Sequence, residues 1–493
     1  MKNISSNVQP LVQGSDFLDS EIVVIGSGPG GFPTACMLAE AGRDVLLIEE
    51  GAFLPQSSSR PFSLEEMETK YRNGGVTFAI GKAKITYVEG CCVGGGSEIN
   101  SGLYHRTPEE VLVRWSSEYM VKSLNYEILE HMFAENENEL NVGYLPGEAP
   151  KASVKLQMGA SLLGWKSMEV PRAFRYDTPY QPDRPKGTRQ SMTEIFLPRF
   201  IKAGGRLMPN SKVLKLKKNS GSAGWDVQSL FMFEKGVKRH ITIRAKTVFA
   251  AAGSIQTPVL LRRSGIRHNI GNSLRFHPTI KVVAEFPEKV NSMEMGVPVH
   301  QVKEFAPKYS FGCSISSLPY ISLALLDHPA QIGGIGEKWE NMANYYCMIS
   351  GGKGIVRAFP FSSDAVVRYS LDEADLCTLS DGLRELCLLL LKAGAKALYP
   401  TIVGAPVIRK KEDLILIPRP LPADRANLMT IHLMGSCPMG EDTARCAVDS
   451  FGKVHGTDGL YINDASILCD AVGVNPQGTI MVLARRNVLN FLN

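Results

Sequence analysis

The chain has 493 residues, enough for two or three domain-sized units, and its composition of 44% hydrophobic and 21% charged residues is ordinary for a globular protein. The net charge of +5 is small for this length and no block of Lys and Arg stands out, which argues against nucleic-acid binding. No apolar run reaches about 18 residues, and the N-terminus lacks a basic region followed by an apolar one. We therefore expect no transmembrane segment, no secretory signal and a cytoplasmic location.

Residues 21–51 carry the pattern of a strand, a helix and a second strand. The apolar runs Ile22–Ile25 and Val45–Ile48 are typical of buried parallel strands. Glycines at G-x-G-x-x-G spacing and then a helical pattern lie between the two runs. These glycines are Gly26, Gly28 and Gly31.

Each part of this unit suits a dinucleotide. We expect Gly26 to allow a tight turn, Gly28 to let the backbone approach a pyrophosphate, and Gly31 to let helix and strand pack closely. The partial positive charge of the helix N-terminus favours the phosphates. Glu49, which closes the second strand, is placed to accept hydrogen bonds from a ribose. The unit predicts dinucleotide binding without saying which dinucleotide.

A second glycine track occurs in residues 90–106, GCCVGGGSEINSGLYHR. Three consecutive glycines begin with Gly94 and Gly95, and Ser97 and Asn100 follow them. Because glycines carry no side chain, the backbone of this track can pass close to a flat ring system. The track is therefore a second candidate for cofactor contact.

Two later segments complete the pattern. Residues 247–266 form a strand that ends in a glycine turn and leads into a helix. Residues 461–481 contain a short strand ending at Asp464, then a loop to Asn475–Pro476 and an apolar helix with Thr479. Asp464 could hold ribityl or phosphate-side hydroxyls of a cofactor, or it could cap a helix, a common role for aspartate. The residues alone leave both interpretations open.

His432 begins the stretch HLMGSCPMG at residues 432–440. A buried structural histidine, a metal ligand and a catalytic base are the three interpretations of this residue. No acidic residue or histidine lies three or four positions later, which disfavours a metal site. His105, His277 and His455 give no sign of a catalytic role, and His277 is expected to be structural.

Together these blocks resemble the glucose–methanol–choline (GMC) oxidoreductases, a family of FAD enzymes. Within that family, VGGGSEINSG and AVGVNPQGTI are most similar to the cholesterol oxidase and long-chain alcohol oxidase branches. The matching stretches follow the family's order along nearly the whole chain, and they are 21–51, 90–106, 187–200, 247–266, 274–278 and 427–485.

The resemblance implies an α/β fold in which a Rossmann-like FAD-binding domain is interleaved with an α+β substrate domain. The substrate domain would be a β-sheet with helices on one face. We expect residues 15–115, 185–290 and 425–493 to form the FAD-binding domain. Residues 116–184 and 291–424 would then form the substrate-binding domain.

The resemblance also implies a site. In the family, the histidine of the H-x-x-G-[ST]-C-x-M-G motif faces the reactive edge of the flavin, and a second histidine or an asparagine faces it as well. These positions match His432, expected to be the base, and Asn475, expected to orient the substrate oxygen. No metal is expected. The implied cofactor contacts are Gly26, Gly28, Gly31, Glu49, Gly94, Gly95, Ser97, Asn100, Val213, Asp464, Ala465, Asn475, Pro476 and Thr479.

The resemblance favours non-covalent FAD. Some members attach FAD through a histidine just before the asparagine of the glycine track. Ile99 holds that position before Asn100, and isoleucine has no nucleophile with which to form the bond.

The function implied is that of a GMC-type alcohol oxidase or dehydrogenase, which moves a hydride from an alcohol to flavin N5 and then passes electrons to oxygen or another acceptor. A non-oxidative flavoenzyme (lyase, isomerase or decarboxylase) and a non-catalytic flavin- or nucleotide-binding module are the alternatives. The substrate is expected to be a small-molecule alcohol. Lipid-like, aromatic and sugar-derived alcohols all remain open.

Overall fold

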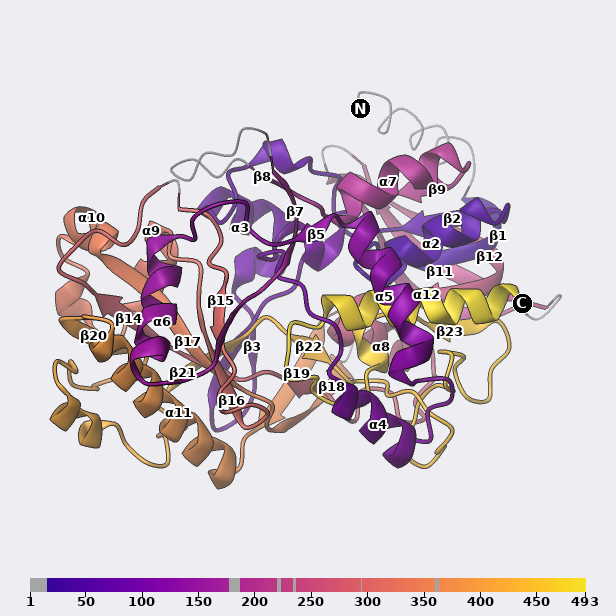
Figure 1. Ribbon diagram of the computed structural model, residues 1–493. Helices are drawn as coiled ribbons and strands as arrows, with labels where there is room; N and C mark the ends of the chain where they lie inside the picture. Colours follow the sequence, from indigo (N-terminus) through magenta and orange to yellow (C-terminus); the bar gives the residue numbers. More distant parts are fainter. Residues whose placement is uncertain are drawn as a thin grey trace.

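The computed structural model describes residues 16–176, 187–219, 223–233, 236–293, 295–359, 362 and 364–493 (Figure 1). Two large sheets organise these residues. The first sheet lies at the right of Figure 1 and the second at the left. None of the helices in the described ranges combines the length and the apolar composition needed to cross a membrane.

The first sheet is built on the two strands that the sequence predicts. β1 (Phe17–Ile25) and β2 (Val45–Ile48) pair in parallel, and α2 (Gly31–Glu40) connects them. β1 also pairs in parallel with β12 (Lys238–Ala250), so the order is β10-β11-β12-β1-β2-β9, with β23 also beside β12. The other strands are β9 (Arg206–Met208), β10 (Ser211–Lys218), β11 (Trp225–Met232) and β23 (Leu460–Ile462).

Both faces of β1 are buried, as expected of a parallel strand. Val23 and Ile25 enter one hydrophobic cluster, and Ile22 and Val24 enter another. Burying a side chain of this size contributes about 1.5–3 kcal/mol relative to exposing it, so these strands anchor the fold. The helices that pack into the two clusters include α2 and α8 (Gly253–Arg263), and also α4 (Glu109–Glu118), α5 (Tyr126–Glu139), α7 (Met192–Lys202) and α12 (Gln477–Leu492).

The second sheet has nine strands within the described residues, in the order β3-β4-β21-β14-β17-β16-β15-β6, with β20 also beside β14. Its central strand β14 pairs antiparallel with β17. The nine strands are β3 (Phe78–Ala79), β4 (Lys84–Tyr87), β6 (Ser167–Glu169), β14 (Thr279–Glu285), β15 (His300–Val302), β16 (Tyr309–Cys313), β17 (Met342–Ile349), β20 (Ala397–Pro400) and β21 (Asn427–Thr430).

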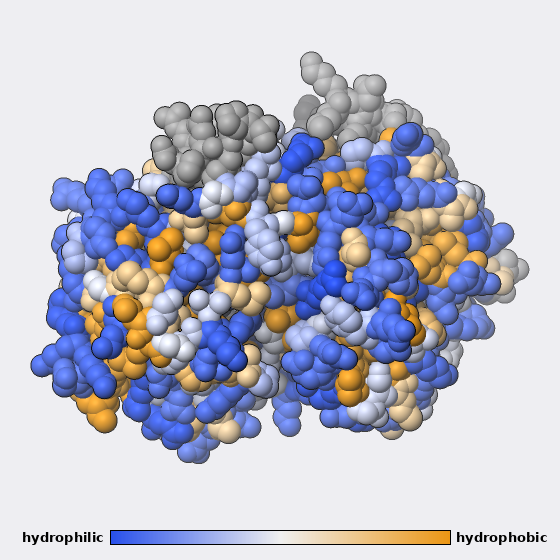
Figure 2. Space-filling model, viewed as in Figure 1, coloured by the Kyte–Doolittle hydropathy of each residue, from blue (hydrophilic) through white to orange (hydrophobic). Residues whose placement is uncertain are grey.

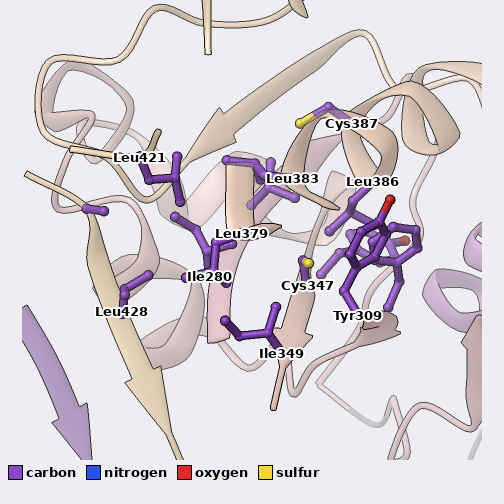
Figure 3. Close-up of a cluster of buried hydrophobic side chains, with 14 of the residues drawn as sticks. Ile280, Tyr309, Cys347, Ile349, Leu379, Leu383, Leu386, Cys387, Leu421 and Leu428 are labelled. Atoms are coloured by element: carbon purple, nitrogen blue, oxygen red, sulfur yellow. The ribbon is translucent and has the colours of Figure 1, made fainter. Parts of the chain in front are cut away.

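Alternate residues of the second sheet point to its two opposite faces, which pack against different helices. Ile280 and Cys347 pack with leucines of α11 (Glu373–Lys392), as Figure 3 shows, and α6 (Lys151–Leu162) covers the same face. The predicted sheet with helices on one face is therefore present. A short helix, α9 (Leu318–Ala324), also packs on part of the opposite face.

The sheets divide the chain differently from the predicted domain boundaries. β4, β14 and β21 fall within the ranges predicted for the FAD-binding domain, yet all three pair in the second sheet. Helix α5 falls within the predicted substrate domain but packs into the hydrophobic cluster of the first sheet. Short strands carry no local indication of the sheet that they join, because pairing depends on residues far away in the sequence.

The remaining elements lie around the two sheets, and the face of the molecule in Figure 2 is mostly hydrophilic, with scattered apolar areas. These elements are α3 (Leu64–Lys70), α10 (Ile335–Lys338), β5 (Val142–Gly143), β7 (Arg172–Tyr176), β8 (Gly187–Arg189), β13 (Arg275–Phe276), β18 (Lys353–Ala358), β19 (Ala365–Ser370) and β22 (Leu433–Met434).

Candidate active site

A cavity of about 400 Å³ lies between the two sheets. Its wall includes the glycine turn after β1, the second glycine track, and residues of β14 and β17. The volume falls in the range of small-molecule sites, which are few in any protein and commonly lie between domains. Most residues predicted to bind the cofactor meet in this one wall.

The glycines of the first turn have different roles. Gly26 has a φ of +98°, and a Cβ added there would lie 2.3 Å from the carbonyl oxygen of Ala251. A Cβ on Gly31 would lie 1.9 Å from the carbonyl oxygen of Gly26, so this glycine lets α2 pack against the turn. Gly28 lines the cavity, and a Cβ there would meet no atom within 4 Å. The open space beside Gly28 fits a pyrophosphate.

The Glu49 carboxylate stabilises the first turn by accepting three hydrogen bonds, and it can accept a further one. Its Oε2 accepts hydrogen bonds from the Ser27 amide (3.0 Å) and hydroxyl (2.7 Å), and its Oε1 accepts one from the Gly51 amide (2.9 Å). Burial raises the pKa of Glu49. A carboxylate has about four lone-pair sites, so one remains for a ribose hydroxyl.

The second glycine track lies directly against the first turn. A Cβ on Gly95 would come within 3.0 Å of the Gly28 Cα, so the two backbones approach closely at the cavity wall. Asn100 also lines the cavity, where its Nδ2 donates to Gln477 Oε1 at 2.6 Å and its Oδ1 accepts from the Gly102 amide at 2.9 Å. These contacts fix the backbone that would face a flat ring.

Asp464 acts as a structural cap. Its Oδ2 accepts hydrogen bonds from Thr257 Oγ1 (2.6 Å) and the Gly253 amide (2.8 Å). Its Oδ1 accepts from the amide (2.8 Å) and the hydroxyl (2.5 Å) of Ser466. Four donors fill the capacity of the carboxylate. Asp464 lies in the cavity wall, but these contacts favour the capping interpretation over a side-chain bond to cofactor hydroxyls.

Four predicted contacts lie behind the wall. Ser97 is buried, donates to the Gly94 carbonyl at 2.8 Å and accepts from the Met192 amide at 3.0 Å, so it holds the track on α7. Thr479 is fully buried and its hydroxyl lies 2.8 Å from that of Thr107. The predicted residues absent from the wall are Gly31, Gly94, Ser97 and Thr479, and those in it are Gly26, Gly28, Glu49, Gly95, Asn100, Val213, His432, Asp464, Ala465, Asn475 and Pro476.

His432 and Asn475, the two residues that the resemblance implies for the reacting site, lie together in the wall. His432 follows β21, Asn475 precedes α12, and the His432 Nε2 lies 3.3 Å from the Asn475 Nδ2. Burial and the positive charge of Lys303 lower the pKa of His432 to about 4. The imidazole is therefore neutral around pH 7.

His277, which the sequence marks only as structural, contacts His432 directly. The two Nδ1 atoms are 2.9 Å apart, and the Gly473 amide donates to the His277 Nε2 at 3.0 Å. Since a backbone N–H can only donate, the proton of neutral His277 lies on Nδ1 and points to His432. If the neutral His432 accepts this proton at Nδ1, its own proton lies on Nε2. The Asn475 Nδ2 beside that atom can also only donate, so the Gly473–His277 contact and the Asn475 contact favour opposite tautomers of His432.

Gln301, which the sequence does not reveal, contacts Asn475, and Tyr346 in turn contacts Gln301. Gln301 Nε2 lies 3.4 Å from Asn475 Oδ1 and 3.1 Å from the hydroxyl of Tyr346. Both residues belong to the second sheet, so this contact connects the sheet to the loop before α12. His105 is buried nearby, and within the described residues its ring nitrogens have no hydrogen-bond partner.

The chain matches known proteins over most of its length. Two family models described as GMC oxidoreductase match residues 67–279 and 362–484. An uncharacterised GMC-type oxidoreductase of Sinorhizobium fredii is 37% identical over 95% of this chain and 94% of its own. The chain belongs to the GMC oxidoreductase family. It is thus an oxidoreductase, and its membership of this family implies a flavin cofactor.

More distant matches agree with this assignment. A long-chain-alcohol oxidase of Arabidopsis thaliana is 28% identical to this GMC oxidoreductase over 94% of the chain and 66% of its own length. The crystal structure of pyridoxine 4-oxidase from Mesorbium loti matches with a TM-score of 0.69 at 17% identity, covering 96% of this chain and 99% of that one. This structural match confirms the predicted fold class.

Proposed function

We propose that this GMC oxidoreductase uses FAD to oxidise an alcohol to an aldehyde or ketone. The observation that carries the proposal is the meeting of His432 and Asn475, 3.3 Å apart, in the cavity that the glycine turn also lines. The likeness to a long-chain-alcohol oxidase supports the same class of reaction. Screening alcohols while following both oxygen uptake and dye reduction tests the proposal and identifies the electron acceptor.

The first turn and the glycine track would hold the cofactor. Gly28 leaves space for the pyrophosphate, Glu49 has capacity for a ribose hydroxyl, and Gly95 and Asn100 offer a backbone surface for the ring. When bound, the flavin accepts the hydride that leaves the alcohol carbon. The protein supplies the position and the electrostatic surroundings of the substrate.

The polar pair would hold the substrate oxygen. In the tautomer with its proton on Nε2, His432 and the Asn475 amide both bring hydrogen-bond donors to one point of the wall. Donors that converge where negative charge develops stabilise an alkoxide-like transition state. This geometry suits the removal of hydride from the carbon that bears the hydroxyl.

The destination of the hydroxyl proton distinguishes two roles for His432. As a base, His432 would accept that proton at Nε2, which requires the opposite tautomer and the loss of the Gly473–His277 hydrogen bond. As a donor, His432 would keep its proton and the hydroxyl proton would leave to water in the cavity. The base role predicted from the sequence stays a prediction. The Gly473–His277–His432 contacts favour the donor role, and the Asn475 amide beside Nε2 favours the base role.

The variant Asn475→Ala is expected to slow flavin reduction about a hundredfold and to change substrate binding less, because a donor to developing charge acts mainly on the transition state. Stopped-flow reduction at a series of substrate concentrations separates the limiting rate from the apparent Kd. An effect confined to the apparent Kd would contradict the role given to Asn475.

The FAD is expected to dissociate from the denatured protein, because Ile99 offers no atom for a covalent link. Acid precipitation should leave the yellow colour in the supernatant, and added FAD should raise the melting temperature of the apoprotein. A hundredfold excess of ligand over Kd contributes about 2.7 kcal/mol to stability. A yellow pellet that survives washing would show a covalent bond.

A further inference from the structure

Lys281 is a cavity-lining residue of the second sheet whose charge the proposed reaction does not use. It lies on β14, and it lines the cavity together with Thr279, two residues earlier on the same face of the strand. Between them, Ile280 turns to the opposite face and packs under α11. The alternation of the strand therefore sends the lysine side chain to the cavity.

Among the residues that the structure describes, no acidic side chain pairs with the Lys281 ammonium group. Within the described residues its one contact is a cation–π contact, with Nζ 5.8 Å from the centre of the Tyr320 ring. Burial lowers the pKa of Lys281 to about 8, which still leaves most of the group protonated at neutral pH. A charged group removed from water is costly unless it is paired, so a cavity-lining lysine of this kind favours an anion beside it.

The acidic residues nearby already have cationic partners. Glu66, which lies close enough to act on Tyr71 and Tyr320, is 3.9 Å from Lys70 Nζ and 3.7 Å from Arg189 Nη2. At the cofactor end of the cavity, two glutamates of the wall share Arg72, and one of them also pairs with Lys212; they are Glu50 and Glu89. The positive charge at the Lys281 end stays uncompensated.

The position of Lys281 relative to the reacting groups can be followed along the sheet. Lys281 is directly opposite Tyr346 in the β14–β17 pairing, and Tyr346 connects through Gln301 to Asn475. His277 lies two residues before β14 and four before Lys281, so the two backbones are at most about 13 Å apart at the rise of an extended chain. The cavity wall between the two ends contains apolar side chains, and they include Ile315, Met348 and Met429.

We propose that Lys281 and the hydroxyls of Tyr320 and Tyr71 form an anion subsite, so that the alcohol substrate carries a carboxylate separated from its hydroxyl by an apolar chain. The two tyrosine hydroxyls lie 3.1 Å apart, so one O–H is used between them and one is left for a ligand; both residues line the same cavity. The Tyr71 hydroxyl also lies 3.5 Å from the Ile99 carbonyl oxygen, at the outer limit of a hydrogen bond. A phenol O–H and an ammonium group are suitable donors for a carboxylate. This inference rests on the proposed alcohol oxidation and specifies the substrate class for it.

The test uses the flavin-loaded enzyme and a ligand without a reactive hydroxyl. Octanoate is titrated by calorimetry into wild type, Lys281→Met, Lys281→Arg and, as a matched control, Lys84→Met. Lys84 is an exposed lysine on β4 of the same sheet. We expect Lys281→Met to weaken octanoate binding roughly tenfold to a hundredfold, Lys281→Arg to retain most of it, and Lys84→Met to leave it unchanged.

A paired kinetic measurement compares 8-hydroxyoctanoate with 1-octanol. The wild type should favour the acid in kcat/KM, and Lys281→Met should remove that preference with unchanged FAD content. Octanoate binding that does not depend on Lys281, or loss of FAD in Lys281→Met, would overturn the subsite. Lysine-dependent octanoate binding without oxidation of any alcohol would instead keep the subsite and refute the proposed function.

Discussion

The variant His432→Ala is expected to keep its flavin and to lose turnover by about 10²–10⁴-fold, the usual contribution of a positioned catalytic group. His432 lies in the cavity wall at the reacting end, so its loss should affect the reaction without removing a cofactor contact. The measurements are kcat with a reactive alcohol and the FAD-to-protein ratio from absorbance. His455→Ala is the control, because His455 bonds the Gly440 carbonyl at 3.1 Å and lies outside the cavity wall.

A second substitution at the same position separates the two roles of His432. In His432→Gln, the amide N–H can replace a hydrogen-bond donor but cannot accept a proton near neutral pH. If His432 acts as a donor, the kcat of His432→Gln should exceed that of His432→Ala at least about tenfold, which is the range of one charge-assisted hydrogen bond. A base role predicts that both variants are equally slow. A rate close to that of the wild type in His432→Ala would exclude both roles.

The variant Gly28→Val is expected to fold and to lose FAD. A side chain at Gly28 would enter space that is open in the protein, so the substitution adds atoms only where the pyrophosphate would lie. The measurement is the FAD content of the purified protein, with circular dichroism as the check on folding. Stoichiometric FAD on a folded Gly28→Val protein would place the phosphates elsewhere.

Substitutions at two other glycines serve as controls for Gly28→Val. Gly143 lies on β5, has an ordinary φ and, like Gly28, has open space where a Cβ would lie, so Gly143→Val should keep normal FAD content. Gly31→Val should fail to fold properly, because its Cβ would overlap the Gly26 carbonyl oxygen at 1.9 Å. Loss of FAD in Gly28→Val alone would therefore identify a ligand effect rather than a general cost of valine.

Local patterns in the sequence were sufficient to predict those elements whose conformation depends on neighbouring residues. The strands around Ile22–Ile25 and Val45–Ile48 and the turn at Gly26 follow from apolar runs and glycine spacing, and the structure has all three. Thr479 shows how a motif can mislead. Pro476, just before α12, and Ile480 within it line the cavity, whereas the Thr479 hydroxyl contacts that of Thr107.

The residues that the sequence did not reveal come from long-range pairing. Gln301 contacts both Asn475 and Tyr346 because β15, β16 and β17 pair side by side, and no local pattern specifies that arrangement. His277 meets His432 across 155 positions, and Lys281 acquires its place in the cavity from the same strand pairing. The family resemblance predicted His432 and Asn475 as the reacting pair, and the three-dimensional structure was required to find the groups that surround them.

Anaerobic mixing of the flavin-loaded enzyme with alcohols tests the central claim most directly. Without oxygen, hydride transfer from the substrate should bleach the oxidised flavin absorbance, and the matching aldehyde or ketone should form in equal amount. We predict this bleaching for at least one alcohol in a panel of lipid-like, aromatic, sugar-derived and carboxylate-bearing compounds. A flavin that stays oxidised with every alcohol, while a chemical reductant bleaches it normally, would contradict alcohol oxidation and favour a non-oxidative or purely binding role.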